Sequence, residues 1–364
     1  MNIVLTGPMG SGKTKLGQKT AIALNMKFID TDALIVKKTG MSINDIFAEH
    51  GEIGFRKHEE KVVAEVSKLD NHIIATGGGV VLNPVNMRLL RTKGIIIYLN
   101  ASFETLYERL KDKKDRPLLK HGDFKKELKK HSQERISLYQ NTDFIIDIDK
   151  MSSDEISEKI VDISRLPLIR ICACIMGDDP EMQIKQASRS GASLVELRFD
   201  LISNPDIAAL IQTSGLPVIA TDRKNKDNLI KAIEEGCNYV DVEIESSAYD
   251  KIIEKAKAHN CRVIASLHDF EKTPENLSFD KKGADFLKIA TKINTVEDGK
   301  RLLQLLQNRN DLIVIGMGKL GSFTRVIAPL FGSYLTYASV TQNTAPGQLS
   351  LKTMNEIYKR RGLR

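Results

Sequence analysis

The first stretch of this 364-residue chain that can do chemistry is "GPMGSGKT", from Gly7 to Thr14. It fits the pattern GxxxxGK[ST] in full, follows an apolar run and opens a helical pattern, so its backbone N–H groups are expected to surround phosphates. The lysine would reach the β- and γ-phosphates, and the threonine hydroxyl would ligate Mg²⁺. The motif therefore predicts an ATP site that contains Gly7, Gly10, Ser11, Gly12, Lys13 and Thr14.

A second candidate is Lys288, which stands inside the apolar stretch "FLKIA". Burial disfavours the charge of a lysine and lowers its pKa, and a neutral amine is a nucleophile toward ketones. The alternative is a lysine whose ammonium group reaches water at the end of a strand. His268, in "SLHDF", taken alone is better interpreted as a structural histidine.

A third motif, "GMGKLG" from Gly316 to Gly321, has the GxGxxG spacing of a dinucleotide site. Such a site needs a βαβ unit and an acidic residue after the second strand. The next strand-like run, "LTYASV", carries no acid there. We therefore predict that the glycines make a tight turn, and that the chain does not catalyse a nicotinamide-dependent reduction.

Composition limits the classes of function. Charged residues make up 28% of the chain and the formal net charge is +7, a mixed surface without aromatic–basic interleaving, so no nucleic-acid partner is expected. No apolar run is long enough for a membrane span, and no secretory leader is visible. The four cysteines form no CxxC pair, which favours buried thiols in a reducing cytoplasm over a metal site.

The elements that must position the first motif alternate between strands and helices. Strand-like runs are "MNIVLTG", "KFIDTD", "HIIATGGG", "GIIIYLN" and "TDFIIDID", with helical stretches between them. This alternation predicts a parallel sheet covered on both faces. A last helix within 151–168 and Pro167 mark the boundary, giving domains at 1–165 and 166–364.

The second half of the chain has a different pattern of apolar runs. Eight short apolar runs recur about every twenty to thirty residues, from "IRICACIM" at 169–176 to "LTYASV" at 335–340, mostly with helical stretches between them. Eight such units predict a (β/α)₈ barrel, in which active sites lie at the carboxyl ends of the strands. Polar side chains stand at these ends, among them Glu196, Arg198, Arg223, Glu243 and Lys288.

Across residues 1 to about 160, the phosphate-binding motif is followed by "DTD", "FRKHE", "TGGGV", "DRPLL" and "ERISLY". In this order the motifs resemble shikimate kinase. The resemblance implies that ATP with Mg²⁺ phosphorylates shikimate, whose carboxylate two guanidinium forks would clamp. The implied shikimate-binding residues are Asp32, Arg56, Gly77, Gly78, Gly79 and Arg135.

The same resemblance assigns further roles. Asp32 would be the base on the phosphorylated hydroxyl, and Asp30 would hold a water on Mg²⁺. Arg116 would close over the transferring phosphoryl group. Arg109 is a candidate for contact with adenine. The basic stretch 111–131 would be the lid that excludes water.

From Ile169 to Arg364, the order "ELRFD", "DVEIE", "SLHDF", "LKIA", "GKLGSFTR" and "TAPGQ" resembles type I 3-dehydroquinate dehydratase. The resemblance implies that Lys288 forms a Schiff base with 3-dehydroquinate, and that no cofactor is used. His268 would move the proton, and Glu243 would orient His268. The implied substrate-binding residues are Glu196, Arg198, Arg223, Arg325, Thr344 and Gln348.

Two departures from the dehydratase pattern are visible. Thr344 replaces the usual serine of the "SAPGQ" loop. No strand-forming sequence is left before "IRICACIM" for a hairpin over the barrel floor. We hypothesise that the first domain covers this floor instead.

The resulting hypothesis is a bifunctional, cytoplasmic enzyme with small-molecule substrates, without nucleic-acid or membrane partners, and with a homodimer as its expected assembly. One alternative keeps the kinase and makes the barrel a non-catalytic scaffold. Another is a nucleotide-dependent switch protein, which would hydrolyse nucleotide without shikimate.

Overall fold

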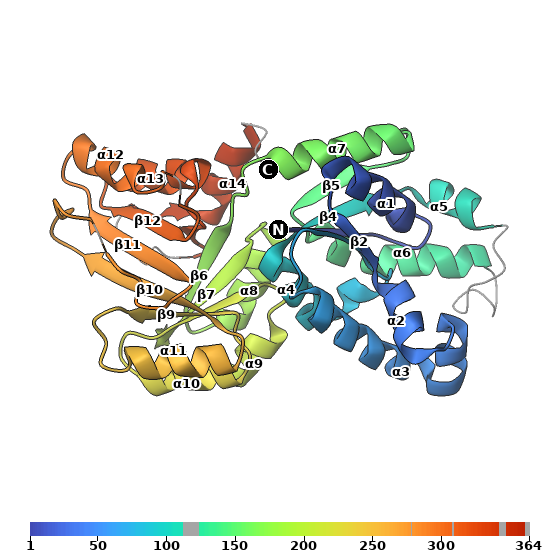
Figure 1. Ribbon diagram of the computed structural model, residues 1–364, viewed down its shortest axis with the longest axis horizontal. Helices are drawn as coiled ribbons and strands as arrows, with labels where there is room; N and C mark the ends of the chain where they lie inside the picture. Colours follow the sequence, from blue (N-terminus) through green and yellow to red (C-terminus); the bar gives the residue numbers. More distant parts are fainter. Residues whose placement is uncertain (112–123, 278, 308, 342–346, 361–364) are drawn as a thin grey trace. The chain divides into compact units, whose positions relative to one another are not determined.

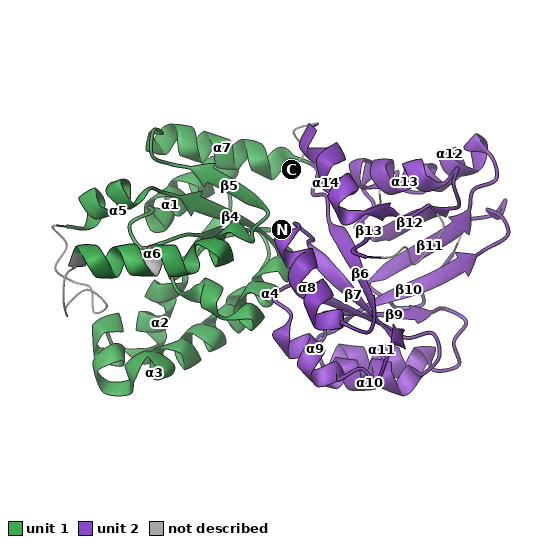
Figure 2. Ribbon diagram, turned by 180° about the vertical axis from the view of Figure 1, so that it is seen from behind, with its two compact units in different colours: residues 1–166 green, residues 167–364 purple. Residues whose placement is uncertain are grey.

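The computed structural model describes residues 1–111, 124–277, 279–307, 309–341 and 347–360 of the chain. They divide into two compact units, residues 1–166 and 167–364 (Figures 1 and 2). Each unit contains its own clusters of buried apolar side chains. We describe each unit by itself.

The described part of the first unit contains a parallel five-stranded sheet, as the alternating pattern predicts. The strand order is β2-β3-β1-β4-β5 (Figure 1). The strands are β1 (Asn2–Thr6), β2 (Lys27–Asp30), β3 (His72–Ala75), β4 (Gly94–Asn100) and β5 (Phe144–Asp147). The helices are α1 (Lys13–Leu24), α2 (Thr31–Thr39), α3 (Ile43–Val66), α4 (Pro84–Lys93), α5 (Phe103–Leu110), α6 (Phe124–Gln140) and α7 (Ser153–Arg165), with a 3₁₀ turn at Val80–Leu82.

The central strands β1, β3 and β4 are buried along almost their whole length because helices cover both faces of the sheet. On one face, Val4, Ile74 and Ile96 belong to the same buried cluster as residues of α3 and α4. On the other face α1 lies so close that a methyl group on Gly17 would come within 2.5 Å of the ring of Phe28. The sheet therefore holds the loop after β1 and the start of α1 at its carboxyl edge.

The described part of the second unit forms a curled parallel sheet in the order β12-β11-β10-β9-β8-β7-β6-β13-β14. Its strands are β6 (Ile171–Gly177), β7 (Leu194–Ile202), β8 (Val218–Thr221), β9 (Tyr239–Glu243), β10 (Arg262–Asp269), β11 (Phe286–Lys292), β12 (Leu312–Met317), β13 (Thr336–Ser339) and β14 (Leu349–Ser350). Its helices are α8 (Pro180–Arg189), α9 (Ile207–Thr213), α10 (Lys226–Glu234), α11 (Tyr249–Ala258), α12 (Val296–Gln304), α13 (Ser322–Ile327) and α14 (Leu351–Arg360), with a 3₁₀ turn at Ala328–Phe331.

The two flanks of this sheet meet where the backbone N–H of Tyr334 donates to the carbonyl of Leu312 at 2.8 Å. The predicted (β/α)₈ architecture is confirmed, since each of the eight predicted runs contains one strand, β6 to β13. The two-residue strand β14 was not predicted. It is too short to show an alternating pattern.

The barrel interior has an aromatic floor, which we define as Tyr239, Phe286 and Tyr334. All three lie at or just before the amino ends of their strands. The rings of Phe286 and Tyr334 stack with centroids 4.0 Å apart, and the hydroxyls of Tyr239 and Tyr334 are 2.6 Å apart. The guanidinium of Arg170 lies 4.4 Å from the Tyr334 ring centroid. Side chains of the same unit therefore fill the end of the barrel opposite the predicted site.

All four cysteines are free and buried, as predicted. Cys172 and Cys174 alternate along β6 and both belong to the buried cluster inside the barrel, so they lie on the same face of this strand. Within the described residues, every helix is either too short or too polar to cross a membrane.

Candidate active sites

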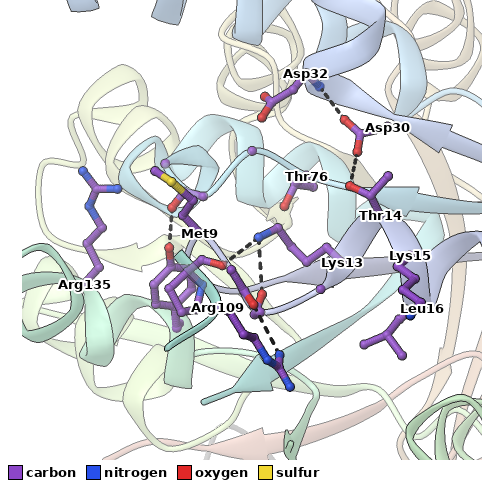
Figure 3. A pocket seen from close by; sticks show the side chains of 18 of the residues that line it. Met9, Lys13, Thr14, Lys15, Leu16, Asp30, Asp32, Thr76, Arg109 and Arg135 are labelled. Atoms are coloured by element: carbon purple, nitrogen blue, oxygen red, sulfur yellow. Dashed lines mark hydrogen bonds between the residues drawn. The ribbon is translucent and has the colours of Figure 1, made fainter. Parts of the chain in front are cut away.

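The first unit contains a cavity of about 630 Å³ at the carboxyl edge of its sheet. Figure 3 shows side chains from the loop after β1, from α2 and from α6 around this cavity. It brings together most of the predicted ATP- and shikimate-binding residues. These are Gly10, Ser11, Gly12, Lys13, Thr14, Asp30, Asp32, Arg56, Gly77, Gly78, Gly79, Arg109 and Arg135.

The phosphate-binding loop has the backbone that its glycines permit. Gly7, Gly10 and Gly12 have φ of 145°, 88° and 90°, a region that other residues rarely adopt. The ammonium of Lys13 donates to the carbonyls of Gly7 at 2.8 Å and of Pro8 at 2.9 Å. Figure 3 shows the Lys13 side chain in the cavity. Gly7 thus contributes to the site although it does not line the cavity.

Asp30 links the loop to α2. Its Oδ2 accepts a hydrogen bond from the Thr14 hydroxyl at 2.6 Å, and its Oδ1 caps α2 through the N–H groups of Asp32 and Ala33 (Figure 3). An aspartate N-cap fixes the start of a helix, so the cap also fixes where the Asp32 side chain begins. The two predicted metal residues, Thr14 and Asp30, are thereby in direct contact.

The three-glycine run has a steric cause. A Cβ atom on Gly77 would lie 2.6 Å from Oδ1 of Asp32, and one on Gly79 would lie 2.2 Å from a guanidinium nitrogen of Arg56. Contacts this short do not occur for real Cβ atoms. Only glycine therefore lets Asp32 and Arg56 lie directly against this backbone.

Arg56 is held by two acids on its own helix. Its guanidinium binds the exposed carboxylate of Glu52 at 2.8 Å and the buried carboxylate of Glu59 at 2.8 Å. Arg135, from α6, lines the same cavity beside Tyr139, whose hydroxyl donates to the carbonyl of Gly78. Arg116 lies outside the described residues, as does most of the basic stretch 111–131.

Arg109 also lies at the loop. It donates from one guanidinium nitrogen to the carbonyl of Gly10 at 3.3 Å, and it lines the cavity (Figure 3). This places a cation beside the phosphate-binding loop, which is compatible with its predicted place in the ATP site.

The second unit contains a cavity of about 500 Å³ at the carboxyl ends of the barrel strands. It brings together most of the residues predicted for this half of the chain. They are Glu196, Arg198, Arg223, Glu243, His268, Lys288, Arg325 and Gln348. Thr344 lies outside the described residues.

Lys288 is buried in the wall of this cavity, with 5% of the residue exposed. Its ammonium binds Oδ2 of Asp241 at 2.8 Å, lies 3.7 Å from Oε1 of Glu196 and sits over the ring of Tyr337 at 4.4 Å. The lysine is therefore buried rather than directed to water at a strand end.

Asp241 is a central acid of this site, and sequence reasoning missed it. Burial works against its ionisation, but Arg223 at 2.8 Å and Lys288 at 2.8 Å hold its pKa well below the usual range. A signal was available, because Asp241 and Glu243 alternate in "YVDVEIE" and alternate residues of a strand share one face. The register pairs Ser266 with both Glu243 and Lys288, which places these positions side by side.

His268 lies on β10, two residues beyond Ser266, and lines the cavity. Burial, together with the nearby charges of Lys288 and Arg223, lowers the pKa of its ring to about 3, although Asp241 opposes this shift. The imidazole is therefore neutral near neutral pH and can accept a proton.

Among the described residues, Glu243 forms its ion pairs with two cations rather than a hydrogen bond with His268. Its carboxylate binds Arg223 at 2.9 Å and Lys226 at 2.8 Å, and no ring nitrogen of His268 has a hydrogen-bond partner among the described residues.

Three further contacts complete the cavity wall. The guanidinium of Arg198 is bidentate to Asp200, at 2.9 and 2.8 Å. The thiol of Cys174 lies 3.3 Å from a carboxylate oxygen of Glu196 and accepts from the Gln348 amide at 3.2 Å. The sequence predicts Cys174 only as a buried thiol, and the structure also places it in the cavity wall.

The run "GMGKLG" forms a tight turn in which the backbone at Gly321 lies against the backbone at Gly316, rather than a dinucleotide site. β12 ends at Met317, and a Cβ atom on Gly321 would come within 2.5 Å of the Gly316 carbonyl carbon. The short helix α13 that follows places Arg325 in the cavity wall, where only 2% of it is exposed. Its Nε has no hydrogen-bond partner among the described residues, so a buried donor is available there.

The described residues contain no group of three or more His, Cys, Asp or Glu side chains placed to hold a metal ion.

Comparisons with known proteins find two families in succession. The model of shikimate kinase matches residues 9–165, and the model of type I 3-dehydroquinase matches residues 171–364. A shikimate kinase of Caldicellulosiruptor bescii is 49% identical over 162 residues, which cover 44% of this chain and 94% of the relative. A 3-dehydroquinate dehydratase of Methanococcoides burtonii is 35% identical over 212 residues, which cover 50% of this chain and 91% of the relative.

Among solved structures, a shikimate kinase from Acinetobacter baumannii in complex with shikimate is 34% identical. The match covers 45% of this chain and 92% of that one, with a TM-score of 0.44.

Proposed function

The chain belongs to the shikimate kinase family over residues 9–165 and to the type I 3-dehydroquinase family over residues 171–364, and on this premise we propose which side chains carry each reaction. The chain is a bifunctional shikimate-pathway enzyme, a kinase followed by a dehydratase. The substrates that follow from the two families are shikimate with ATP, and 3-dehydroquinate.

In the kinase, the observation that carries the proposal is the contact of Asp32 and Arg56 with the glycine run. Arg56 and Arg135, which both line the cavity, bind the shikimate carboxylate through their guanidinium groups. Asp32 accepts the proton of the hydroxyl that attacks the γ-phosphorus of ATP, and ADP leaves. Lys13 exchanges its carbonyl partners for phosphate oxygens. Arg116 and Arg109 neutralise and hold the nucleotide.

Mg²⁺ fits the oxygen donors at the start of α1. The hydroxyl of Thr14 and the carboxylate of Asp30 lie 2.6 Å apart, and Mg²⁺ favours one or two such ligands together with substrate phosphates. When bound there, it supplies positive charge to the phosphate oxygens.

In the dehydratase, the carrying observation is a buried lysine that shares its cavity with a neutral histidine. Lys288 gives up a proton, its amine adds to the substrate ketone, and water leaves to form an iminium ion. His268 removes a proton from the neighbouring carbon, the carbon–oxygen bond breaks, and His268 returns the proton to the departing hydroxyl. Hydrolysis of the iminium ion frees 3-dehydroshikimate and the amine.

The remaining cavity residues bind substrate or position one another. Arg325 offers its buried Nε to the substrate carboxylate. Glu196, Arg198, Arg223 and Gln348 hold the ring hydroxyls, and the family resemblance adds Thr344 to the substrate-binding residues. We replace the direct action of Glu243 on His268 by an action through Arg223, because Glu243 and Arg223 form the ion pair.

Borohydride trapping tests the dehydratase proposal. The full chain is mixed with 3-dehydroquinate and sodium borohydride, and its peptides are weighed by mass spectrometry. We expect a stable adduct on the peptide that contains Lys288, absent in Lys288→Ala. Neither adduct nor dehydration would leave the alternative of a kinase with a silent barrel. Dehydration without an adduct would contradict the imine mechanism.

The kinase is tested by ADP formation with and without shikimate. We expect formation to depend on shikimate and to fall at least a hundredfold in Asp32→Asn. Nucleotide hydrolysis at the same rate without shikimate would instead support a switch protein. A cytoplasmic location and a homodimer remain proposals, which cell fractionation and light scattering check.

A further inference from the structure

The kinase cavity contains a buried acid that the reaction proposed above does not use. Glu59, on α3, is 0% exposed and lines the cavity. Its Oε2 accepts a hydrogen bond from Arg56 at 2.8 Å. Its Oε1 has no hydrogen-bond partner among the described residues. An ionised carboxylate with one oxygen unsolvated and unbonded is costly to bury.

The free oxygen of Glu59 shares its space with the base of the reaction. A Cβ atom on Gly77 would lie 2.6 Å from Oδ1 of Asp32 and 3.2 Å from Oε1 of Glu59, so both oxygens border the same small volume. The charged groups that face Glu59 are Arg56 from α3, Asp32 from α2 and Arg135 from α6. Burial raises the pKa of Glu59 and Asp32 adds to this rise, and together they exceed the lowering by Arg56 and Arg135.

Shikimate binding changes this balance in one direction. The proposed binding mode brings a carboxylate to Arg56 and Arg135, the two cations that stabilise ionised Glu59. It adds a negative charge nearby and displaces water from the cavity. Each of these changes makes the ionised form of Glu59 less favourable.

We propose that Glu59 is a positioning residue that takes up a proton from solvent when shikimate binds. The protonated Oε1 is then a hydrogen-bond donor beside the carboxylate of Asp32. It keeps that carboxylate ionised and directed at the substrate, and it removes the repulsion between the two acids. The inference rests on the proposed shikimate site and adds a proton to its binding equilibrium.

Isothermal titration calorimetry of the full chain tests this inference. Shikimate is titrated at each of several pH values between 6 and 9, in buffers of different ionisation enthalpy, and the slope of heat against that enthalpy counts protons. We expect net uptake, at most one proton, for the natural chain and none for Glu59→Gln, which keeps the shape of the side chain. By linkage, shikimate affinity should fall with rising pH, by at most about tenfold per pH unit, and stay flat in Glu59→Gln.

Glu52→Gln is the matched control. Glu52 binds the same guanidinium at the same distance of 2.8 Å, but 51% of its side chain is exposed, so its loss should leave the proton count unchanged. Dehydratase activity of the same preparations shows that the chain is intact. Binding without proton uptake in the natural chain would overturn the inference, whatever the variants do, and so would equal uptake in Glu59→Gln. Absence of shikimate binding would instead contradict the proposed function.

Discussion

The protonation state of His268 sets the pH range in which the dehydratase site can act. Burial, together with Lys288, Arg223 and Arg198, lowers the pKa of the ring to about 3, although Asp241 opposes the shift. A base acts when it is deprotonated, and a lowered pKa extends this state to more acidic pH. We expect kcat/KM for 3-dehydroquinate to show no histidine limb near pH 6.5.

Initial rates between pH 4 and 9, with preincubation controls for stability, check this expectation. A limb of the pH profile near pH 6.5 that disappears in His268→Gln would show that His268 of the free enzyme becomes protonated there. This result would contradict the lowered pKa that follows from its burial beside Lys288 and Arg223.

The buried carboxylate of Asp241 holds two cations, so its removal should destabilise the barrel. Asp241→Asn leaves Arg223 and Lys288 without their shared charge, and breaking a buried pair costs about 3–5 kcal/mol. Hydrogen exchange of peptides from β9 to β11, read by mass spectrometry, measures the loss in this unit alone.

Glu297→Gln is the comparison for Asp241→Asn. It breaks an ion pair with Lys300 in which both side chains are more than 60% exposed. Such a pair contributes less than about 1 kcal/mol. Equal losses of hydrogen-exchange protection in the two variants would mean that the buried ion pairs of Asp241 stabilise the barrel no more than an exposed ion pair does.

Among individual residues, those that stand in motifs could be predicted from the sequence, and those that act through a neighbouring side chain could not. Lys288 was recognisable as a lysine inside an apolar strand. Asp241 stands one alternate position before Glu243, but nothing in the sequence says which acid of the pair meets the lysine. Glu59 was visible in "FRKHE", and its burial depends on how α3 packs beside α2.

The elements that carry the sites were predicted more completely than the contacts inside them. Continuous apolar runs identify buried parallel strands, and all thirteen predicted runs contain strands in the structure. Boundaries depend on local chemistry that short patterns do not resolve. α3, for example, continues across Gly51, which has φ of 64° and interrupts the regular helix.

The glycine run after β3 gives a prediction at this scale. In Gly79→Ala, the added methyl would lie 2.2 Å from the Arg56 guanidinium, which must move away from the substrate carboxylate. We expect KM for shikimate to rise at least tenfold while KM for ATP changes little. Steady-state kinetics of the kinase reaction measure both.

Gly78→Ala tests whether the clash is the cause. Its methyl would meet its nearest neighbour, the backbone nitrogen of Met9, at 3.4 Å, an ordinary contact. A rise in KM as large as that of Gly79→Ala would point to general disturbance of the loop rather than to Arg56.

Taken as a whole, the molecule joins two chemistries with different requirements. The kinase site has oxygen donors suited to Mg²⁺, whereas the dehydratase proposal relies on an amine and an imidazole. We expect EDTA to abolish phosphorylation of shikimate and to leave dehydration of 3-dehydroquinate within about twofold.

Both rates are measured on one preparation, and added Mg²⁺ should restore the first. Loss of dehydration in EDTA, restored by a divalent ion, would contradict the proposed roles of Lys288 and His268.

The order of the two units along the chain could be predicted because each unit carries its own motifs and its own core. The contents of the barrel floor could not be predicted, since Tyr239, Phe286 and Tyr334 come from separate strands and meet only after the sheet curls. The hypothesis that the first domain covers the floor stays a prediction, and separate expression of residues 166–364 tests it.

The aromatic floor also determines by which route substrate enters and product leaves the barrel. Because the described side chains fill the amino end of the barrel, 3-dehydroquinate must enter and 3-dehydroshikimate must leave through the same mouth at the carboxyl ends of the strands. Substrate and product therefore compete for the same cavity. We therefore expect accumulated 3-dehydroshikimate to inhibit the dehydratase competitively, so that more 3-dehydroquinate overcomes the inhibition. In the cell, the reaction that consumes 3-dehydroshikimate would relieve it.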